Sequence, residues 1–185
     1  MGLSFRSKEV TGTLTDRQDN RLTRRVTRMA LLTAIALTIF MAEAQIPNPI
    51  PIPGIKLGLA NIVTVYAMFV LGPADTLMIL VSRVFLGSVF SGQMMTFFYS
   101  LSGGLVCYAA MLILRRVLTR KQIWVCSCVG GTCHNIGQLA AAILIARTPA
   151  LIVYLPYLLL AGMAAGLFTG LCAQFLTARL DKFGG

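Results

Sequence analysis

Acidic side chains, and charged side chains in general, are scarce in this sequence. Of its 185 residues, 12% are Asp, Glu, Lys or Arg, six are acidic, one is histidine, and 57% are apolar. That balance excludes an ordinary soluble domain. A helix needs about 20 apolar residues to cross a hydrocarbon core of about 30 Å, and several apolar runs approach that length. We therefore expect an all-α, polytopic membrane protein with no room for a separate soluble catalytic domain.

Motifs for metal, disulfide or nucleotide chemistry are also missing. Cys126-x-Cys128 followed by Cys133-His134 has a spacing seen in metal sites, but a helix turns positions 126 and 128 to different faces. All five cysteines lie within or beside apolar runs, which argues against a disulfide framework. The chain has no Walker motif. We expect no metal site, no resident cofactor and no ATPase activity in this chain.

Positive charge is plentiful by comparison, with a formal net charge of +10. The basic residues cluster at the ends of apolar runs, which favours membrane topology over nucleic-acid binding as their role. We divide the chain into a basic arm (1–28), a membrane domain (29–178) and a short tail (179–185). Within the membrane domain the sequence predicts six spans, at residues 29–46, 57–71, 74–92, 93–114, 122–146 and 149–178.

The distribution of Lys and Arg predicts the orientation of these spans. If the N-terminus is cytoplasmic, the inner side holds the basic arm, the 115–121 link and the tail, whereas the outer side holds Lys56 and Arg147. Both termini are then cytoplasmic. The tract "PNPIPIPGIK" between the first two spans lies outside, where a polyproline-like strand needs no internal hydrogen bonds. We expect it to cover the mouth of the bundle as a lid.

Polar residues inside predicted spans are costly, so each is a candidate functional residue. They come from several spans and gather from the midplane outward, which predicts a ligand pocket that opens to the outer side. The candidate ligand-binding residues are Glu43, Lys56, Asn61, Arg83, Tyr99, His134, Asn135 and Gln138. His134 and Gln138 are four residues apart and share one helix face.

Each candidate also has a purely structural interpretation. Arg83 and Glu43 could simply pair and hold the bundle together. His134 and Asn135 could only bond a neighbouring helix. Lys56, at the edge of a span, could anchor that helix at the membrane interface.

Two small-residue patterns predict helix contacts. Gly162, Gly166 and Gly170 recur every four residues, which permits close backbone approach inside the bundle. Ala30, Ala34 and Ala36 make a small-residue patch on the cytoplasmic half of the first span, where a membrane partner could dock.

Several segments together resemble one family. They are "KLGLANIV", "LGPADTLMILVSRVFLGSVFSG", "SLSGGL" and "HNIGQL", in this order within residues 29–178. They resemble the Gx transporter family, whose members are often labelled heptaprenyl diphosphate synthase component I. That family in turn is similar to the S components of energy-coupling-factor (ECF) transporters.

The resemblance implies a six-helix bundle in the bacterial inner (cytoplasmic) membrane, with both termini inside and a loop-covered ligand pocket near the outer face. It also implies an Ala-x-x-x-Ala contact surface on the first helix, which Ala30 and Ala34 match. The partners implied are a small-molecule substrate, a transmembrane coupling protein and two cytosolic ATPases.

The expected function is capture of a small molecule from the outer face for ATP-driven uptake. One alternative, from proteins that accompany the family, is a membrane subunit of quinone- or flavin-linked electron transfer. Another is an accessory membrane subunit of isoprenoid synthesis. Prenyl chain elongation needs paired Asp-rich clusters, and the chain has six scattered acidic residues, so we expect it not to be catalytic on its own.

Overall fold

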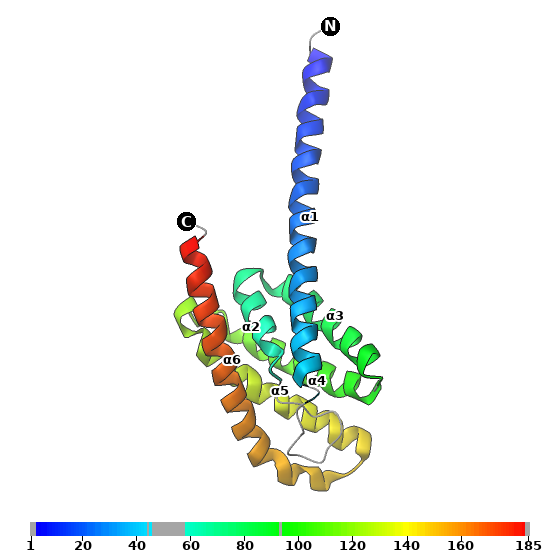
Figure 1. Cartoon of the computed structure of the whole chain (residues 1–185), viewed down its shortest axis with the longest axis vertical. Coiled ribbons are helices and arrows are strands. Elements are labelled where there is room, and N and C mark those ends of the chain that lie inside the picture. The colour runs from blue at the N-terminus through cyan, green and yellow to red at the C-terminus, as the bar shows by residue number, and fades with distance from the viewer. Residues whose placement is uncertain (1–2, 44, 46–57, 93, 184–185) are drawn as a thin grey trace.

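A computed structural model describes residues 3–43, 45, 58–92 and 94–183. These residues form six α-helices and two short 3-10 helices, and they contain no strand, which confirms the all-α prediction. The α-helices are α1 (Leu3–Glu43), α2 (Asn61–Val70), α3 (Pro73–Ser91), α4 (Met94–Leu114), α5 (Ile123–Ala146) and α6 (Leu155–Phe183). The 3-10 helices are η1 (Arg120–Gln122) and η2 (Pro149–Tyr154), before α5 and α6 (Figure 1).

Among the described residues, five helices are long and apolar enough to cross a membrane, and α2 is the exception. Its 10 residues rise only about 15 Å, roughly half of a hydrocarbon core. The membrane character of the protein is supported, whereas six crossings remain a prediction. The second span was expected to be helical from residue 57, but α2 begins at Asn61 because Gly58 has a φ of 82°, outside the helical region.

Prolines and glycines set two other boundaries. Gly72, with φ 111°, ends the turn after α2, and Pro73 is the first residue of α3. The last predicted span is divided into η2 and α6, and Pro156 lies in the first turn of α6, where a proline needs no hydrogen-bond donor.

Glycines bring α5 and α6 into close contact. A Cβ atom at Gly166 would lie 2.5 Å from the Ser127 carbonyl oxygen, and one at Gly162 would lie 2.7 Å from the Gly131 carbonyl oxygen. The hydroxyls of Ser127 and Thr169 are 3.0 Å apart and join the same two helices. The glycine repeat therefore serves packing within the bundle.

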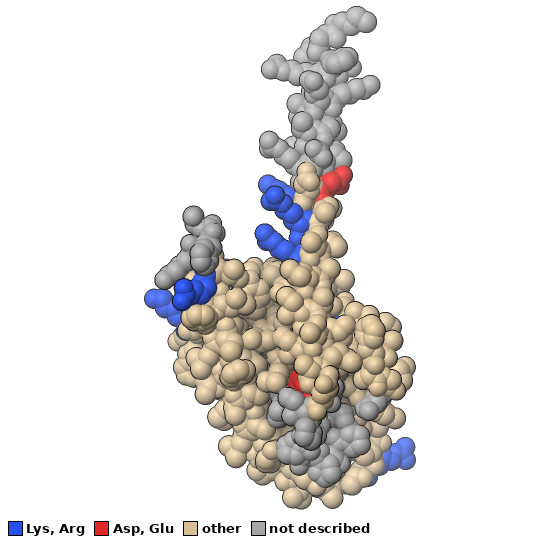
Figure 2. Space-filling model, in the orientation of Figure 1, with Lys and Arg blue, Asp and Glu red and all other residues tan. Residues whose placement is uncertain are grey.

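Helix α1 is less embedded than its neighbours. It packs against α2 and α3, while its first turns project far beyond the bundle (Figure 1). The start of α1 and the end of α6 project from the same end of the molecule. Basic side chains gather there, where α1 leaves the bundle and around the end of α6 (Figure 2). This arrangement is consistent with both ends on one side of a membrane, and which side they face remains a prediction.

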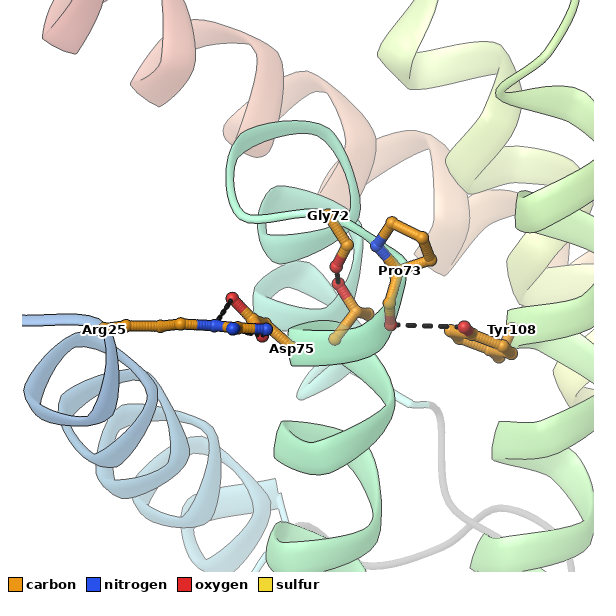
Figure 3. A network of polar contacts seen from close by, with 6 residues as sticks. Arg25, Gly72, Pro73, Asp75 and Tyr108 are labelled. Carbon is orange, nitrogen blue, oxygen red and sulfur yellow. Dashed lines mark hydrogen bonds and ion pairs between the residues drawn. The ribbon is translucent and has the colours of Figure 1, made fainter. Parts of the chain in front are cut away.

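A polar network fixes α1 to the α2–α3 turn at this end. The Arg25 guanidinium forms an ion pair with the Asp75 carboxylate, with its Nε 2.8 Å from Oδ1 and 3.0 Å from Oδ2. The Tyr108 hydroxyl donates to the Pro73 carbonyl at 3.2 Å, which adds α4 to the network (Figure 3).

Candidate functional site

The centre of the candidate site is a buried hydrogen bond between α3 and α2. Arg83 comes from the middle of α3 and is 4% exposed, and its guanidinium donates to Asn61 Oδ1 at 2.8 Å. Asn61 is the first residue of α2 and is 5% exposed. The short helix α2 therefore begins inside the bundle beside the buried cation of Arg83. The N-terminal end of a helix dipole is positive, so α2 does not neutralise this charge.

Glu43, the last residue of α1, adds a carboxylate to this region. It is 5% exposed, it accepts a hydrogen bond of 2.5 Å from the Gly58 backbone N–H, and its charge attracts Arg83. The hydrogen bonds join Arg83 to Asn61 and Glu43 to Gly58, so direct pairing of the two charges stays a prediction.

Gly58 joins these residues to His134 on α5. A Cβ atom at Gly58 would lie 3.0 Å from Asn61 Nδ2 and 3.3 Å from His134 Cδ2. The absence of a side chain here lets the backbone that precedes α2 lie directly against the imidazole. One turn further along α5, Gln138 is 1% exposed. Sequence spacing alone predicted that His134 and Gln138 share a face, and both do meet α4 at Gly103, where a Cβ would lie 2.6 Å from Gln138 Cγ and 3.1 Å from His134 Cε1.

Several buried polar atoms in this region have no hydrogen-bond partner among the described residues. They are Arg83 Nε, His134 Nδ1, Asn135 Oδ1 and Gln138 Oε1. A buried polar atom without a partner costs about 1–3 kcal/mol, so native proteins keep few of them. Donors or acceptors from outside the described residues would satisfy this set. We call Glu43, Asn61, Arg83, His134 and Gln138 the polar cluster.

Asn135 and Tyr99 lie apart from the polar cluster. The Asn135 side-chain amide donates to the Leu158 carbonyl on α6 at 2.8 Å, as the structural interpretation of this residue predicted. Tyr99 is 8% exposed and packs in an apolar group with Leu139, Ala142 and Leu158. Their predicted role in ligand binding is therefore less direct than that of the cluster residues. Lys56 and the proline tract lie outside the described residues.

The predicted partner surface on α1 lines a groove. Ala30 and Ala34 are exposed, and with α3 residues they border an apolar groove of about 390 Å³. Ala36 is instead fully buried in the core, so it does not belong to this surface. The lining residues are Val26, Met29, Ala30, Thr33, Ala34, Leu37, Met78, Ile79, Ser82 and Leu86. Small residues on α1 create this groove because they leave the space beside α3 unfilled.

Sequence reasoning missed the glycines that build the polar cluster. Gly58 and Gly103 carry no polar side chain, and their importance comes from what their backbones touch. Gly58 also has a positive φ of 82°. In the described part of the chain, no group of three His, Cys, Asp or Glu residues could hold a metal ion.

Comparison with known proteins places this helical chain in a family. The profile of the family described as "Heptaprenyl diphosphate synthase component I" matches residues 32–176, which is most of the chain. No curated protein matched the chain, and no solved structure matched it. The further likeness to ECF S components remains a prediction from motifs. The motifs identified in the sequence and the extent of this match agree, and the chain belongs to the heptaprenyl diphosphate synthase component I family.

Proposed function

We propose that this protein is a ligand-binding membrane subunit that captures a small molecule at the polar cluster for uptake driven by a separate ATP-hydrolysing complex. The observation that carries the proposal is the set of buried, unpartnered polar atoms on Arg83, His134 and Gln138. Three atoms of this kind, converging from α3 and one face of α5, are what a ligand with complementary polar groups would satisfy.

The charges of the cluster favour a ligand with an anionic group. Arg83 faces the first turn of α2, so the cation and the positive end of a helix dipole coincide. Glu43 offsets part of that charge and is itself engaged with Gly58. In this scheme Arg83 binds the anionic group, while His134, Gln138 and Asn61 orient the ligand by hydrogen bonds. Lys56, predicted from the sequence to help balance the anion, lies outside the described residues.

Energy for transport must come from partners, because the chain has no ATPase motif. We assign the groove at Ala30 and Ala34 to a transmembrane coupling protein, which would in turn contact two cytosolic ATPases. Small residues that leave an apolar groove permit close approach of a partner helix. Transport would proceed by rocking of the whole bundle.

A binding experiment with matched variants tests the proposal. Purified protein is titrated with vitamin-like, flavin and quinone-precursor compounds, and the best binder is measured again with Gln138→Leu. We expect affinity to fall roughly 10-fold or more because a buried hydrogen bond is lost. Gln174→Leu is the control, since Gln174 Oε1 is also buried and unpartnered among the described residues but lies on α6. Absence of binding for every compound, together with no co-purified coupling protein, would contradict the proposal.

The family description favours a second candidate, an accessory subunit of isoprenoid synthesis. A catalytic role would require carboxylates that gather around diphosphate groups, yet Glu43 contacts Gly58 near the end of α1 and Asp75 pairs with Arg25 at the start of α3. We therefore propose this candidate only in a non-catalytic role. Unchanged prenyl diphosphate synthesis in a strain that lacks this protein would rule out this second candidate function.

A further inference from the structure

Four arginines line a pocket at the end of the bundle away from the polar cluster. Arg21, Arg24, Arg25 and Arg28 follow a spacing of three, four and seven residues and share one face of α1. Together with Val70, Leu71 and Asp75 they border a pocket of about 290 Å³. Helix α2 runs from the polar cluster at Asn61 to this pocket at Val70, so the two sites lie at opposite ends of the shortest α-helix.

One of the four arginines is already neutralised. Arg25 is paired with Asp75, whose side chain is 9% exposed, and Figure 3 shows the guanidinium extended toward that carboxylate. Within the described part of the chain, no acidic group or hydrogen-bond acceptor pairs with the side chains of Arg21, Arg24 or Arg28. The pocket therefore has a net positive charge and three guanidinium groups available to an anion.

An apolar groove continues from the basic pocket toward the interior of the bilayer. It has a volume of about 350 Å³ and is lined by Arg28, Leu31, Leu32, Tyr66, Val70 and Leu71. Arg28, Val70 and Leu71 border both cavities, so the two are contiguous. The change from arginines to leucines along α1 coincides with the start of its apolar run at Met29.

We propose that this composite site binds an anionic phospholipid, with the phosphate of the headgroup held by Arg21, Arg24 and Arg28 and an acyl chain in the groove between α1 and α2. Guanidinium groups bind phosphate with paired hydrogen bonds, and basic pockets at the membrane surface select anionic headgroups. The lipid would come from the leaflet at the end where α1 leaves the bundle.

The adjoining groove distinguishes a lipid from a free anion. Inorganic phosphate or a soluble metabolite would use the arginines and leave Leu31, Leu32 and Tyr66 uncovered. A phospholipid would occupy both cavities, with its phosphate among the arginines and an acyl chain in the apolar groove. It would also fill space beside α1, which packs mainly against α2 and α3, so bound lipid is expected to stabilise the attachment of α1 to the bundle.

Native mass spectrometry of the full-length protein tests the proposal. Delipidated protein is mixed with phosphatidylglycerol, phosphatidylcholine or inorganic phosphate, and bound species are counted. We expect one phosphatidylglycerol to be retained per chain, no comparable retention of phosphatidylcholine, and no displacement by inorganic phosphate. Replacing Arg21, Arg24 and Arg28 with Gln is expected to weaken retention roughly 100-fold.

The control carries the same charge change at the same end of the bundle. It replaces Arg115, Arg116 and Lys121 with Gln in the link between α4 and α5, and it should retain the lipid. If the first triple variant fails to fold, Arg24→Gln is compared with Arg116→Gln instead. Equal retention by both variants would overturn the proposal, as would equal binding of phosphatidylcholine. Displacement by inorganic phosphate would show an anion site without lipid specificity and would overturn it too.

Discussion

Arg83 is the residue on which the interpretation of the polar cluster depends most. Its guanidinium donates a hydrogen bond to Asn61 and is attracted electrostatically by Glu43. Its Nε has no hydrogen-bond partner among the described residues. A residue with only a structural role would be expected to use all its donors within the bundle. Arg83 therefore combines a contact between α3 and α2 with a donor that, under the proposed function, binds the ligand.

A double-mutant cycle separates these two roles. Arg83→Ala removes the cation but leaves Glu43 buried, so we expect the free energy of unfolding to fall by about 3 kcal/mol. Glu43→Gln in the same chain should restore part of that loss, because the uncompensated charge is gone. Thermal unfolding in detergent measures the stability of each variant. If Arg83→Ala unfolds like the unmodified protein, the electrostatic coupling to Glu43 is negligible.

The Arg25–Asp75 ion pair should respond asymmetrically to mutation. Arg25→Gln leaves the buried Asp75 carboxylate without its counter-charge, whereas Asp75→Asn leaves an arginine that is half exposed and can be hydrated. We expect Arg25→Gln to lower the melting temperature more than Asp75→Asn does. The double variant should resemble Asp75→Asn. Equal effects of the two single changes would show that hydration reaches both partners.

At the scale of single residues, the sequence predicted much of the polar cluster. Rarity of polar residues in apolar runs was a sufficient signal for Glu43, Asn61, Arg83, His134 and Gln138. It could not separate Asn135 and Tyr99 from the rest, because helix rotation and neighbour contacts decide which buried polar residue bonds α6 and which meets the cluster. It also gave no indication of Gly58, whose effect comes from backbone position alone.

At the scale of elements, α5 and α6 make a close backbone contact. It depends on glycines of α6 that face backbone atoms of α5, where there is no room for a side chain. The four-residue repeat predicted this contact because it places the glycines on one helix face. The beginning of α2 was predicted less well, since Leu57, Leu59 and Ala60 continue the apolar run on both sides of Gly58.

Gly166→Ala tests this contact directly. The added Cβ would lie 2.5 Å from the Ser127 carbonyl oxygen and 2.8 Å from Cys128 Cα. Both are backbone positions, so α5 and α6 must move apart, and we expect stability to fall by about 2 kcal/mol. Ala164→Val enlarges an exposed residue on the same helix and should have little effect. Thermal unfolding of the two variants gives the comparison, and similar melting temperatures would contradict the predicted close contact.

At the scale of the whole molecule, the basic residues predict how the bundle sits in a membrane. The start of α1, the α4–α5 link and the end of α6 carry most of the described Lys and Arg residues, whereas Arg147 follows α5 at its other end. All-helical architecture followed from composition and run length. The number of crossings did not follow from them. Helix α2 has 10 residues, too few to cross a membrane alone, and the segment before Gly58 lies outside the described residues.

Cysteine labelling of intact cells tests the orientation. In a variant without the five native cysteines, Arg147→Cys should react with a membrane-impermeant reagent added outside, because the α5–α6 link is predicted to be external. Arg116→Cys should react only after the cells are permeabilised. The reverse pattern would mean that the bundle has the opposite orientation, and the polar cluster would then open toward the cytoplasm.

The length of α1 has a mechanical consequence. An unbroken helix of 41 residues is about 60 Å long, twice the thickness of a hydrocarbon core. Its far end is Glu43, which holds the Gly58 backbone against His134. A helix is stiff along its axis. We therefore expect tilt or rotation of the projecting part of α1 to move Glu43, which belongs to the polar cluster. A partner that tilts the projecting part of α1 is then expected to disturb the contact between Glu43 and Gly58.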